Sequence, residues 1–470
     1  MSQMKLCALG LGSNLGNRAK HIHDALKLIT ARVPNTSVIN TAHLYESEPM
    51  YETNQPAFLN SACMLETTLR PMQLLQQLKH IEADLGRNKS HTRYGPRTID
   101  LDILLYDNLV MNHIDTPSTQ FSGTSTGLDL EIPHPRLPER GFVLQPLADI
   151  APNIVHPVLG LTIASLCEKL GDEQLPRVIP LPNGQLVPWG KRTLLMGVLN
   201  VTPDSFSDGN SFLKPADAVS HAQSMVSSGA DIIDIGGQST RPGAVRVSAE
   251  EELSRIAPIV QQIRSDGMCV PISVDTFYSS VAHELLQTGS VDIINDVSGG
   301  KFDEKMYSVV SKHCCPMVIM HSRGNAQNMQ ALAKYGDDVV QDVVDELEIC
   351  VKGAMQAGVP RWSLISDPGF GFAKALEDNV TLLRHLDRFS SGPEGLGFPL
   401  LLGCSRKSFL GRLGGGAFDG RGGEGDLVVG DRDFATAACC ALSVPWVDIL
   451  RVHNVRGMRN AVGVADALRR

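Results

Sequence analysis

The stretch LLMGVLN, Leu194 to Asn200, is a short apolar run that ends in a polar side chain, and seven similar runs follow it. Those seven are DIIDIGG (231–237), PISVDT (271–276), DIINDVS (292–298), PMVIMH (316–321), WSLISDP (362–368), PLLLGCS (399–405) and VDILRVH (447–453). Segments with helical spacing separate the runs. Near-continuous apolar strands suit a parallel sheet that is covered on both faces. Eight strands alternating with helices therefore predict a (β/α)8 TIM barrel.

Polar residues gather at the C-terminal side of these runs. They are Asn200, Asp234, Thr240, Asp275, Asn295, Asp296, His321, Asp367, Ser405, Lys407, Arg451 and His453. In such barrels the carboxyl ends of the strands carry the active site. We therefore expect a site for a flat polar ring and an anionic group, with Asp275, Asn295 and Asp367 converging on the donor edges of the ring. Taken alone, a strand-end residue such as Asp296 is as often a helix cap, and a lone His321 is more often structural than catalytic.

The chain has 470 residues, which is too long for one ordinary core and predicts two or three domains. The stretch 171–188 is rich in proline and has neither helical nor strand periodicity, so we interpret it as a linker. It would separate a domain at 1–170 from the barrel at 189–470. The first domain mixes strand-like runs with two helical patterns, Arg18–Val33 and Pro71–Leu85, and is therefore predicted to be α+β.

Composition excludes several classes of protein. A net charge of −9 argues against nucleic-acid binding driven by overall charge, and no apolar run approaches the roughly 18–20 residues of a membrane span. The ten cysteines form no CxxC pair and indicate reduced thiols of an intracellular protein. Because an apolar strand follows almost directly after the first Met, we expect a cytoplasmic protein. The alternative is a mitochondrial or plastid form whose presequence is absent from this chain.

A second stretch with chemistry is RTIDLDILLYD, residues 97–107. In a strand, Asp100 and Asp102 project from the same face, where two carboxylates repel each other unless something positive lies between them. The simpler interpretation is a solvated face of an edge strand. However, basic residues flank the pair on both sides, and carboxylates ringed by guanidinium groups suit a Mg²⁺–polyphosphate site. Two metals about 3.5–4 Å apart would fit adjacent carboxylates.

Five motifs of the first domain resemble 6-hydroxymethyl-7,8-dihydropterin pyrophosphokinase. They are GLGSNLGNR (10–18), QPAFLN (55–60), HIEADLGR (80–87), RYGPRTIDLDILLY (93–106) and IPHPRLPERGFVLQPL (132–147). The resemblance implies a ferredoxin-like α+β fold and pyrophosphoryl transfer from ATP to the pterin hydroxymethyl group. It also implies that Asp100 and Asp102 hold two Mg²⁺ ions. The same resemblance implies that the triphosphate contacts Arg87, Arg97, His134 and Arg140, and that the catalytic residues of this half are Arg87, Arg97, Asp100 and Asp102. The pterin would contact Asn60, Phe58 and Phe142.

Seven motifs of the second domain resemble dihydropteroate synthase. They are MGVLNVTPDSFSDG (196–209), DIGGQSTRPGA (234–244), SVDT (273–276), INDVSG (294–299), SDPGFGF (366–372), CSRKSFLG (404–411) and ILRVHNV (449–455). The resemblance implies condensation of a pterin diphosphate with p-aminobenzoate, with one Mg²⁺. It also implies sulfonamide inhibitors as ligands that mimic p-aminobenzoate, and a homodimer formed through the barrel.

Residue roles follow from the same resemblance. The pterin would contact Asp275, Asn295, Asp367, Phe372 and Lys407. The p-aminobenzoate would contact Phe206, Thr240, Arg241, Pro242 and Ser408. The diphosphate would contact Thr240, Arg451 and His453, and Asn200 would bind the metal. Lys407, Arg451 and His453 would be catalytic. Together the two halves predict one chain for two consecutive steps of folate synthesis.

Two alternatives remain. A pterin-binding methyltransferase would share the barrel but would not need a fused kinase. A non-catalytic scaffold protein with one inactive half would lack a residue such as Asp100, Asp102, Asn200 or Lys407, and all four are present.

Overall fold

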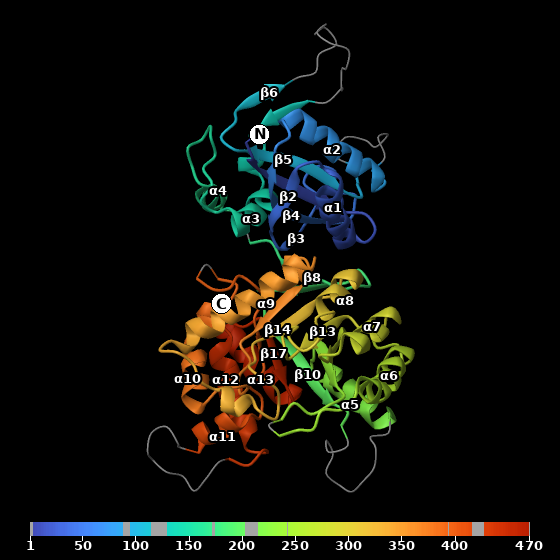
Figure 1. Ribbon diagram of the computed structural model, residues 1–470, viewed down its shortest axis with the longest axis vertical. Helices are drawn as coiled ribbons and strands as arrows, with labels where there is room; N and C mark the ends of the chain where they lie inside the picture. The colour runs from blue at the N-terminus through green and yellow to red at the C-terminus, as the bar shows by residue number, and fades with distance from the viewer. Residues whose placement is uncertain are drawn as a thin grey trace. The chain divides into compact units, whose positions relative to one another are not determined.

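The structure is a computed structural model that describes residues 3–87, 95–113, 129–171, 174–202, 215–241, 243–392, 394–415 and 427–469 (Figure 1). The chain forms two compact units, Met1–Ile179 and Pro180–Arg470. Each unit is built around a sheet of its own. Across the described ranges, no helix combines the length and the apolar character that crossing a membrane would require.

The first unit contains a sheet with strand order β5-β1-β4-β3-β8, and β2 also pairs with β4. These five pairs of strands are antiparallel. The strands are β1 (Lys5–Ser13), β2 (Thr36–Thr41), β3 (Leu44–Ser47), β4 (Phe58–Thr67), β5 (Asp100–Tyr106) and β8 (Arg177–Pro180), and β6 (Met111–His113) pairs separately with β7 (Leu130–Ile132). The order of β5, β1, β4 and β3 is that of a ferredoxin-like sheet, which confirms the predicted fold of this unit.

Helices cover both faces of this sheet. Helix α1 (Arg18–Arg32) and helix α2 (Pro71–Asp84) pack against each other, α1 against β1 and α2 against β5. Helix α3 (Gly141–Ile150) packs on β4 and against α4 (Ile163–Leu170), and the short 3-10 turn η1 (Leu137–Glu139) precedes it. A cluster of buried side chains, including Ala8, Ala62 and Leu144, fills the layer beneath α3.

The register of β1 and β5 creates an open floor beside the two aspartates. Gly12 lies opposite Asp100, and Gly10 lies opposite Asp102. A Cβ atom on Gly10 would lie 3.3 Å from Leu104 Cδ2, so a larger residue would crowd this face. Because these two positions of β1 carry no side chain, space remains above the strands where Asp100 and Asp102 project.

The stretch expected to be an irregular linker contains two short strands. Strand β8 pairs with β3 through Val178 and Leu44, and a turn at Leu181–Gln185 leads into β9 (Leu186–Trp189). Each strand has only four residues and contains or borders a proline, so neither shows a readable alternation in the sequence. The expected domain boundaries stay a prediction.

The second unit contains eight parallel strands in the order β15-β14-β13-β12-β11-β10-β17-β16. An additional parallel bridge between Ser366 and Leu400 brings the two ends of this order together, which confirms the predicted barrel. The strands are β10 (Leu194–Asn200), β11 (Ile232–Gly236), β12 (Ile272–Asp275), β13 (Ile293–Asp296), β14 (Met317–Met320), β15 (Leu364–Asp367), β16 (Leu401–Leu402) and β17 (Ile449–Val452). Each of the eight apolar runs in the sequence contains one of them.

Helices surround the strands of the barrel (Figure 1). They are α5 (Pro215–Ser227), α6 (Ala249–Ser265), α7 (Ser279–Gln287), α8 (Met306–His313), α9 (Val339–Gln356), α10 (Leu376–Arg384), α11 (Ser408–Gly414), α12 (Arg432–Ser443) and α13 (Val455–Arg469), with 3-10 turns η2 (Met329–Leu332), η3 (Arg361–Ser363) and η4 (Leu386–Phe389). The apolar faces of these helices and the outward side chains of the strands form one continuous core. The carboxyl ends of the strands therefore present their polar residues on a rigid scaffold.

Helix α9 offers a test of this core. Leu347 is fully buried, whereas Ile349, two positions later on the same helix, is 69% exposed. Leu347→Ala should lower the free energy of unfolding of the barrel by about 2–5 kcal/mol, because it leaves a cavity in close-packed surroundings. Ile349→Ala should change it by less than about 0.5 kcal/mol. Urea unfolding followed by circular dichroism measures both, and equal effects of the two substitutions would contradict the packing described.

Candidate active sites

The first candidate site is a cavity of about 470 Å³ over the glycine floor of β1 and the start of β5. Its lining includes Gly10, Gly12, Asn60, Arg87, Arg97, Asp100, Asp102, His134, Arg140 and Phe142. Phe58 lines it as well, so every residue that the sequence predicted for this half lies around one cavity. The residues come from β1, β4, β5, the end of α2 and the start of α3, which are distant in sequence.

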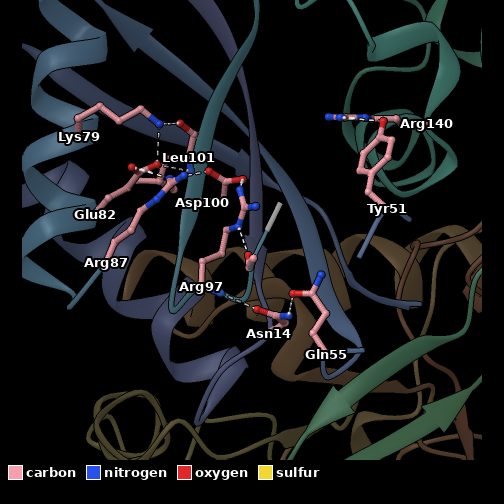
Figure 2. A network of polar contacts seen from close by, with 11 residues as sticks. Asn14, Tyr51, Gln55, Lys79, Glu82, Arg87, Arg97, Asp100, Leu101 and Arg140 are labelled. Carbon is pink, nitrogen blue, oxygen red and sulfur yellow. Dashed lines mark hydrogen bonds and ion pairs between the residues drawn. The ribbon is translucent and has the colours of Figure 1, made fainter. Parts of the chain in front are cut away.

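Two arginines hold the first aspartate. Arg87 Nη1 lies 2.6 Å from Asp100 Oδ1, and Arg97 Nη1 lies 2.6 Å from Asp100 Oδ2 (Figure 2). Arg97 is itself fixed through its backbone N–H, which donates to Asn14 Oδ1 at 2.7 Å. Asn14 in turn donates to Gln55 Oε1 at 3.0 Å. The positive charge that the sequence placed near the aspartates is therefore in direct contact with one of them.

The two carboxylates differ in their protonation. Burial raises the pKa of Asp100, but the guanidinium groups of Arg97 and Arg87 outweigh burial and the pKa is lowered. Asp102 has its pKa raised to about 6, by burial first and by the charge of Asp100 second. Asp102 is thus an ionised carboxylate near neutral pH, and any additional positive charge nearby would stabilise its ionised form.

A buried glutamate beneath the site escaped the sequence analysis. Glu82 on α2 is 2% exposed and accepts from Lys79 Nζ at 2.8 Å and from the backbone N–H of Leu101 at 2.7 Å. Its Oε2 lies 2.6 Å from Arg87 Nη1, the same nitrogen that contacts Asp100. Glu82 therefore ties α2 to the start of β5 and orients Arg87. A charged residue on the apolar face of a helix is the one sign of this role in the sequence.

The opposite wall of the cavity is also basic. Tyr51 OH accepts from Arg136 Nη1 at 2.8 Å. It also accepts from Arg140 Nη2 at 3.3 Å (Figure 2). The guanidinium of Arg140 lies 5.5 Å from the ring centroid of Phe142. Arg140 Nε is buried and has no hydrogen-bond partner within the described residues, so it is a donor available to an anion. Tyr51 was not predicted, because it lies in a loop without periodicity.

His134 and Asn60 line the cavity in different ways. Burial, and after it the charge of Arg140, lower the pKa of His134 to about 4, so the imidazole is neutral near pH 7. Asn60 is 5% exposed and donates to Ser47 Oγ at 2.9 Å, so its side chain is already oriented. A neutral imidazole and a fixed amide can bind polar edges of a ligand without adding charge.

The donor set at the two aspartates fits magnesium. The described residues contain no group of three or more His, Cys, Asp or Glu side chains arranged around one point. Magnesium in proteins is commonly held by one or two carboxylates, with phosphate oxygens and waters completing its octahedron. Asp100 and Asp102 supply two carboxylates, and the guanidinium groups of Arg97 and Arg140 line the same cavity.

The second candidate site lies at the carboxyl ends of the barrel strands. Arg451 on β17 reaches across to two strands: its Nε lies 2.7 Å from Asp234 Oδ2, and its Nη2 lies 2.9 Å from Asp275 Oδ2. Asn295 Nδ2 donates to the same Asp234 oxygen at 3.1 Å. Arg451 and Asn295 thus both contact Asp234, which the sequence analysis left without a role, and Asp275 shares Arg451 with it.

Asp234 is the most deeply buried member of this group, with no exposed surface. Its second oxygen, Oδ1, has no hydrogen-bond partner in the part of the chain that the structure describes. Gly236, two residues later, leaves room beside it, since a Cβ there would lie 3.6 Å from Asn200 Oδ1 and 3.7 Å from Asp275 Cβ. An acidic residue inside an otherwise apolar strand was the available sign of this buried role.

Burial shifts the titration of the groups that face the site. The pKa of Asp275 is raised to about 7, by burial above all, while Arg451 lowers it and Asp234 raises it. Burial likewise raises the pKa of Asp367, against the lowering effect of Lys407. Burial lowers the pKa of Lys407 to about 8, although Asp367 opposes that change. Such shifts are common at functional sites.

Lys407 is held by the loop that follows β15. Its Nζ donates to the carbonyl oxygen of Phe370 and lies 4.5 Å from the ring centroid of Phe372. Gly371 has a φ of +76°, and a Cβ there would lie 3.0 Å from Lys407 Cδ. The aliphatic part of the lysine therefore packs on the glycine while its ammonium group stays near Asp367.

His453 and Asn200 lie at the ends of adjacent strands, β17 and β10. His453 Nδ1 is 3.0 Å from Ser405 Oγ, and burial, followed by the charge of Arg451, lowers the pKa of His453 to about 3. The imidazole is thus neutral and acts as a polar ligand, not as a cation. Asn200 supplies one amide oxygen, so a metal there would take most of its ligands from a bound diphosphate and water.

The predicted p-aminobenzoate residues are only partly described. Thr240 lines a cavity of about 160 Å³ together with Phe372, Arg241 is exposed, and Ser408 begins α11. Phe206 and Pro242 lie outside the described residues. The structure therefore brings Thr240 close to the predicted pterin residue Phe372.

Two family models match the chain. Residues 8–152 match 7,8-dihydro-6-hydroxymethylpterin-pyrophosphokinase, and residues 196–453 match the pterin binding enzymes. The matched ranges contain both candidate sites.

Similar proteins span nearly the whole chain. It is 42% identical over 489 residues to the "Folate synthesis bifunctional protein, mitochondrial" of Pisum sativum, covering 98% of this chain and 88% of that protein. It is 41% identical over 468 residues to the "Folic acid synthesis protein fol1" of Pneumocystis carinii, covering 98% of this chain but only 59% of that protein. The solved structure of the pyrophosphokinase–dihydropteroate synthase of Plasmodium falciparum with pterin and p-hydroxybenzoate matches this chain with a TM-score of 0.75 at 23% identity. The match covers 100% of this chain and 96% of the Plasmodium chain, and at this identity it concerns the fold alone.

The contact between Arg451 and Asp234 yields a prediction for Asp275. Asp234→Asn removes a negative charge near Asp275 and frees Arg451 to pair with Asp275 alone, so the pKa of Asp275 should fall from about 7 toward its ordinary range. Carboxyl ¹³C NMR titration of aspartate-labelled protein measures the change. Asp231→Asn is the control, because Asp231 begins the run that contains β11 and pairs with Arg192 and Arg459 instead. An unchanged or raised pKa of Asp275 in Asp234→Asn would contradict the electrostatics described.

Proposed function

The chain belongs to the family of bifunctional folate-synthesis proteins, and we propose from this membership that it catalyses two consecutive reactions. The first transfers a pyrophosphoryl group from ATP to 6-hydroxymethyl-7,8-dihydropterin. The second joins the resulting pterin diphosphate to p-aminobenzoate and releases pyrophosphate and 7,8-dihydropteroate. The chain spans 59% of the length of the two fungal relatives described as folic acid synthesis proteins, so the proposal covers these two steps alone.

The first reaction would take place over the glycine floor of β1. Arg87, Arg97 and Arg140 would neutralise the charge that shifts between the phosphates during transfer. The neutral His134 would donate a hydrogen bond to the triphosphate, while the fixed amide of Asn60 and the rings of Phe58 and Phe142 would hold the pterin. Tyr51 would orient Arg140, to which its hydroxyl is bonded.

Magnesium would be held by Asp100 and Asp102 in this site, with two ions, and by Asn200 in the barrel, with one. When bound, it neutralises phosphate charge and orients the diphosphate groups. The chain's own contribution is a pair of ionised carboxylates. Asp102 has a pKa of about 6, so a neighbouring cation would stabilise its ionised form.

The second reaction would use the buried carboxylates of the barrel. Asp275 and Asp367, with Asn295, would accept and donate hydrogen bonds along the edge of the pterin, and Lys407 would lie between the pterin and p-aminobenzoate. Arg451 and His453 would stabilise the departing pyrophosphate as the methylene–oxygen bond breaks. The arylamine nitrogen is neutral and nucleophilic near pH 7, so it attacks the methylene carbon without a strong base, and it loses its proton to water afterwards.

One observation carries the proposal: Asp234, Asp275, Asn295 and Arg451, from four different strands, form a single buried polar network at the carboxyl end of the barrel. A purely structural barrel would not need two carboxylates and an arginine there, since buried charge is costly. The same site would bind sulfonamides, which share the aryl amine of p-aminobenzoate.

We also propose that the protein forms a homodimer through α12 and α13, which pack side by side. Four large apolar side chains on these helices are strongly exposed: Phe434 at 84%, Leu442 at 81%, Val464 at 62% and Leu468 at 82%. Several strongly exposed apolar side chains on two neighbouring helices are typical of a protein–protein interface.

The proposed compartment is a reducing one, the cytoplasm or the interior of an organelle. The cysteines are free thiols, several of them buried, as in proteins kept reduced. The name of the pea relative carries the word mitochondrial, which supports the organelle as the alternative. Fluorescence microscopy of the tagged protein with organelle markers distinguishes the two.

The two reactions can be tested in one tube and then separated. Purified protein with hydroxymethyldihydropterin, ATP, Mg²⁺ and p-aminobenzoate should produce AMP and dihydropteroate, and a sulfonamide should compete with p-aminobenzoate. Asp100→Ala should lower AMP formation by about a hundredfold or more while leaving the conversion of supplied pterin diphosphate intact, because the two sites lie in separate units. The control is Asp84→Ala, a surface residue of α2 paired with Arg32. Loss of both activities in Asp100→Ala would mean that the units do not act independently.

The dimer has its own test. Leu442→Glu places a charge on the exposed apolar face and should shift the protein from dimer to monomer in analytical ultracentrifugation, because a buried unpaired carboxylate is costly. Ile349→Glu, on the exposed face of α9, should leave the dimer unchanged. A wild-type protein that sediments as a monomer would refute the proposal.

A further inference from the structure

A buried lysine lies beneath the barrel site and has no role in the chemistry proposed above. Lys374, which precedes α10, is 4% exposed. Its Nζ donates to three acceptors: the carbonyl oxygen of Gly369 at 3.0 Å, the carbonyl oxygen of Phe372 at 3.1 Å and Nδ1 of His321 at 2.9 Å. An ammonium group has three protons, so all of its donors are used within the protein.

The charge of Lys374 is balanced through His321. Because His321 accepts from the lysine at Nδ1, its proton lies on Nε2, which is 3.0 Å from Glu346 Oε2. Arg323 Nε donates to the other oxygen of Glu346 at 2.9 Å. Burial raises the pKa of Glu346, but the hydrogen bonds from His321 and Arg323 outweigh burial and the pKa is about 2. Burial lowers the pKa of Lys374 to about 7, although Asp367 opposes that change. Lys374 is thus joined to the Glu346 carboxylate through a neutral imidazole.

Two peptide groups connect Lys374 to the substrate site. The N–H of Gly369 donates to Asp367 Oδ1 at 2.7 Å, while the carbonyl oxygen of the same glycine accepts from Lys374. Phe372, whose carbonyl oxygen is the second acceptor, presents its ring to the ammonium group of Lys407. One buried lysine therefore holds the segments that orient both Asp367 and Lys407.

The backbone of this loop combines a turn of its own, in which the N–H of Phe372 donates to the carbonyl oxygen of Gly369, with bonds from its neighbours. Gly369 has a φ of +70°, and a Cβ there would lie 2.0 Å from the carbonyl oxygen of His321. Ala373 adopts a φ of +48°, which costs energy for a residue other than glycine. Tyr335 OH donates to the carbonyl oxygen of Ala373 at 2.9 Å and so restrains this residue. Bonds from outside the loop thus compensate for a backbone that is unfavourable by itself.

We propose that Lys374, paired with Glu346 through His321, is a positioning residue for the pterin pocket, which holds the Gly369–Phe372 loop so that Asp367 and Lys407 face the same ligand. This inference rests on the proposed synthase function, whose substrate it concerns. Lys374 does not touch the ligand and takes no part in bond breaking. It acts on binding, since the carboxylate and the ammonium group that it positions contact the pterin before and after the reaction.

The test measures dihydropteroate formation from supplied pterin diphosphate. Lys374→Met keeps the length of the side chain but removes the charge and all three hydrogen bonds. It should raise KM for pterin diphosphate about tenfold, because the binding free energy lost is expected to equal roughly that of one hydrogen bond. The value of kcat should fall less than about threefold. A purely structural role would lower the melting temperature and the active fraction, so kcat would fall at an unchanged KM.

A second variant and a control complete the design. Glu346→Gln retains an acceptor for His321 but removes the counter-charge, and it should raise the same KM about threefold even if Lys374→Met fails to fold. Lys352→Met, on the same helix α9, removes a lysine paired with Glu348 at the surface and should change neither constant. An inactive wild-type protein would refute the proposed function. An active wild type, with unchanged KM in folded Lys374→Met and Glu346→Gln, would overturn the positioning role alone.

Discussion

The contact between Arg451 and the two buried carboxylates, Asp234 and Asp275, is the constraint on which the barrel site depends. A carboxylate removed from water is unstable unless a cation or several donors face it. Asp234 has no exposed surface, so Arg451 must come from the neighbouring side of the barrel to meet it. This requirement fixes the ends of β17, β11 and β12 relative to one another, and Asn295 from β13 joins the same oxygen. The scaffold and the binding groups are therefore stabilised by the same interaction.

The pyrophosphokinase half follows the same logic with different elements. Asp100 is neutralised by two arginines, and one of them, Arg87, is shared with the buried Glu82. Each half thus contains charged groups at the candidate site and a deeper charged residue beside them. Glu82 contacts Arg87 in the first unit, and Lys374 contacts the loop that adjoins Asp367 and Lys407 in the second. In both cases the deeper residue is bonded on all sides by protein. The side chains of both candidate sites are therefore oriented by contacts within the protein, as a preorganised site would require.

The sequence was sufficient to predict the structure where a pattern repeats along the chain or where side chains alternate strictly between the two faces of a strand. Eight apolar runs contained eight strands, and the alternation around Asp100 and Asp102 placed both carboxylates over one cavity. It was insufficient where function depends on contacts between distant segments. Glu82, Tyr51 and Lys374 belong to no repeating pattern in the sequence, and their partners lie on other elements. Strands β8 and β9 were missed because four residues bordered by proline show no alternation.

The packing of Gly369 has a consequence for how this protein could evolve under an antifolate drug. A side chain at that position would overlap the carbonyl oxygen of His321, and the adjacent Gly371 is pressed against Lys407. In the proposed synthase, most substitutions here would disrupt the proposed pterin pocket along with the site of an inhibitor bound there. A compound confined to the floor of the pterin pocket would therefore meet a surface with few viable escape mutations. A compound that extends past Thr240 toward the exposed Arg241 would contact positions that can change at less cost to the natural reaction.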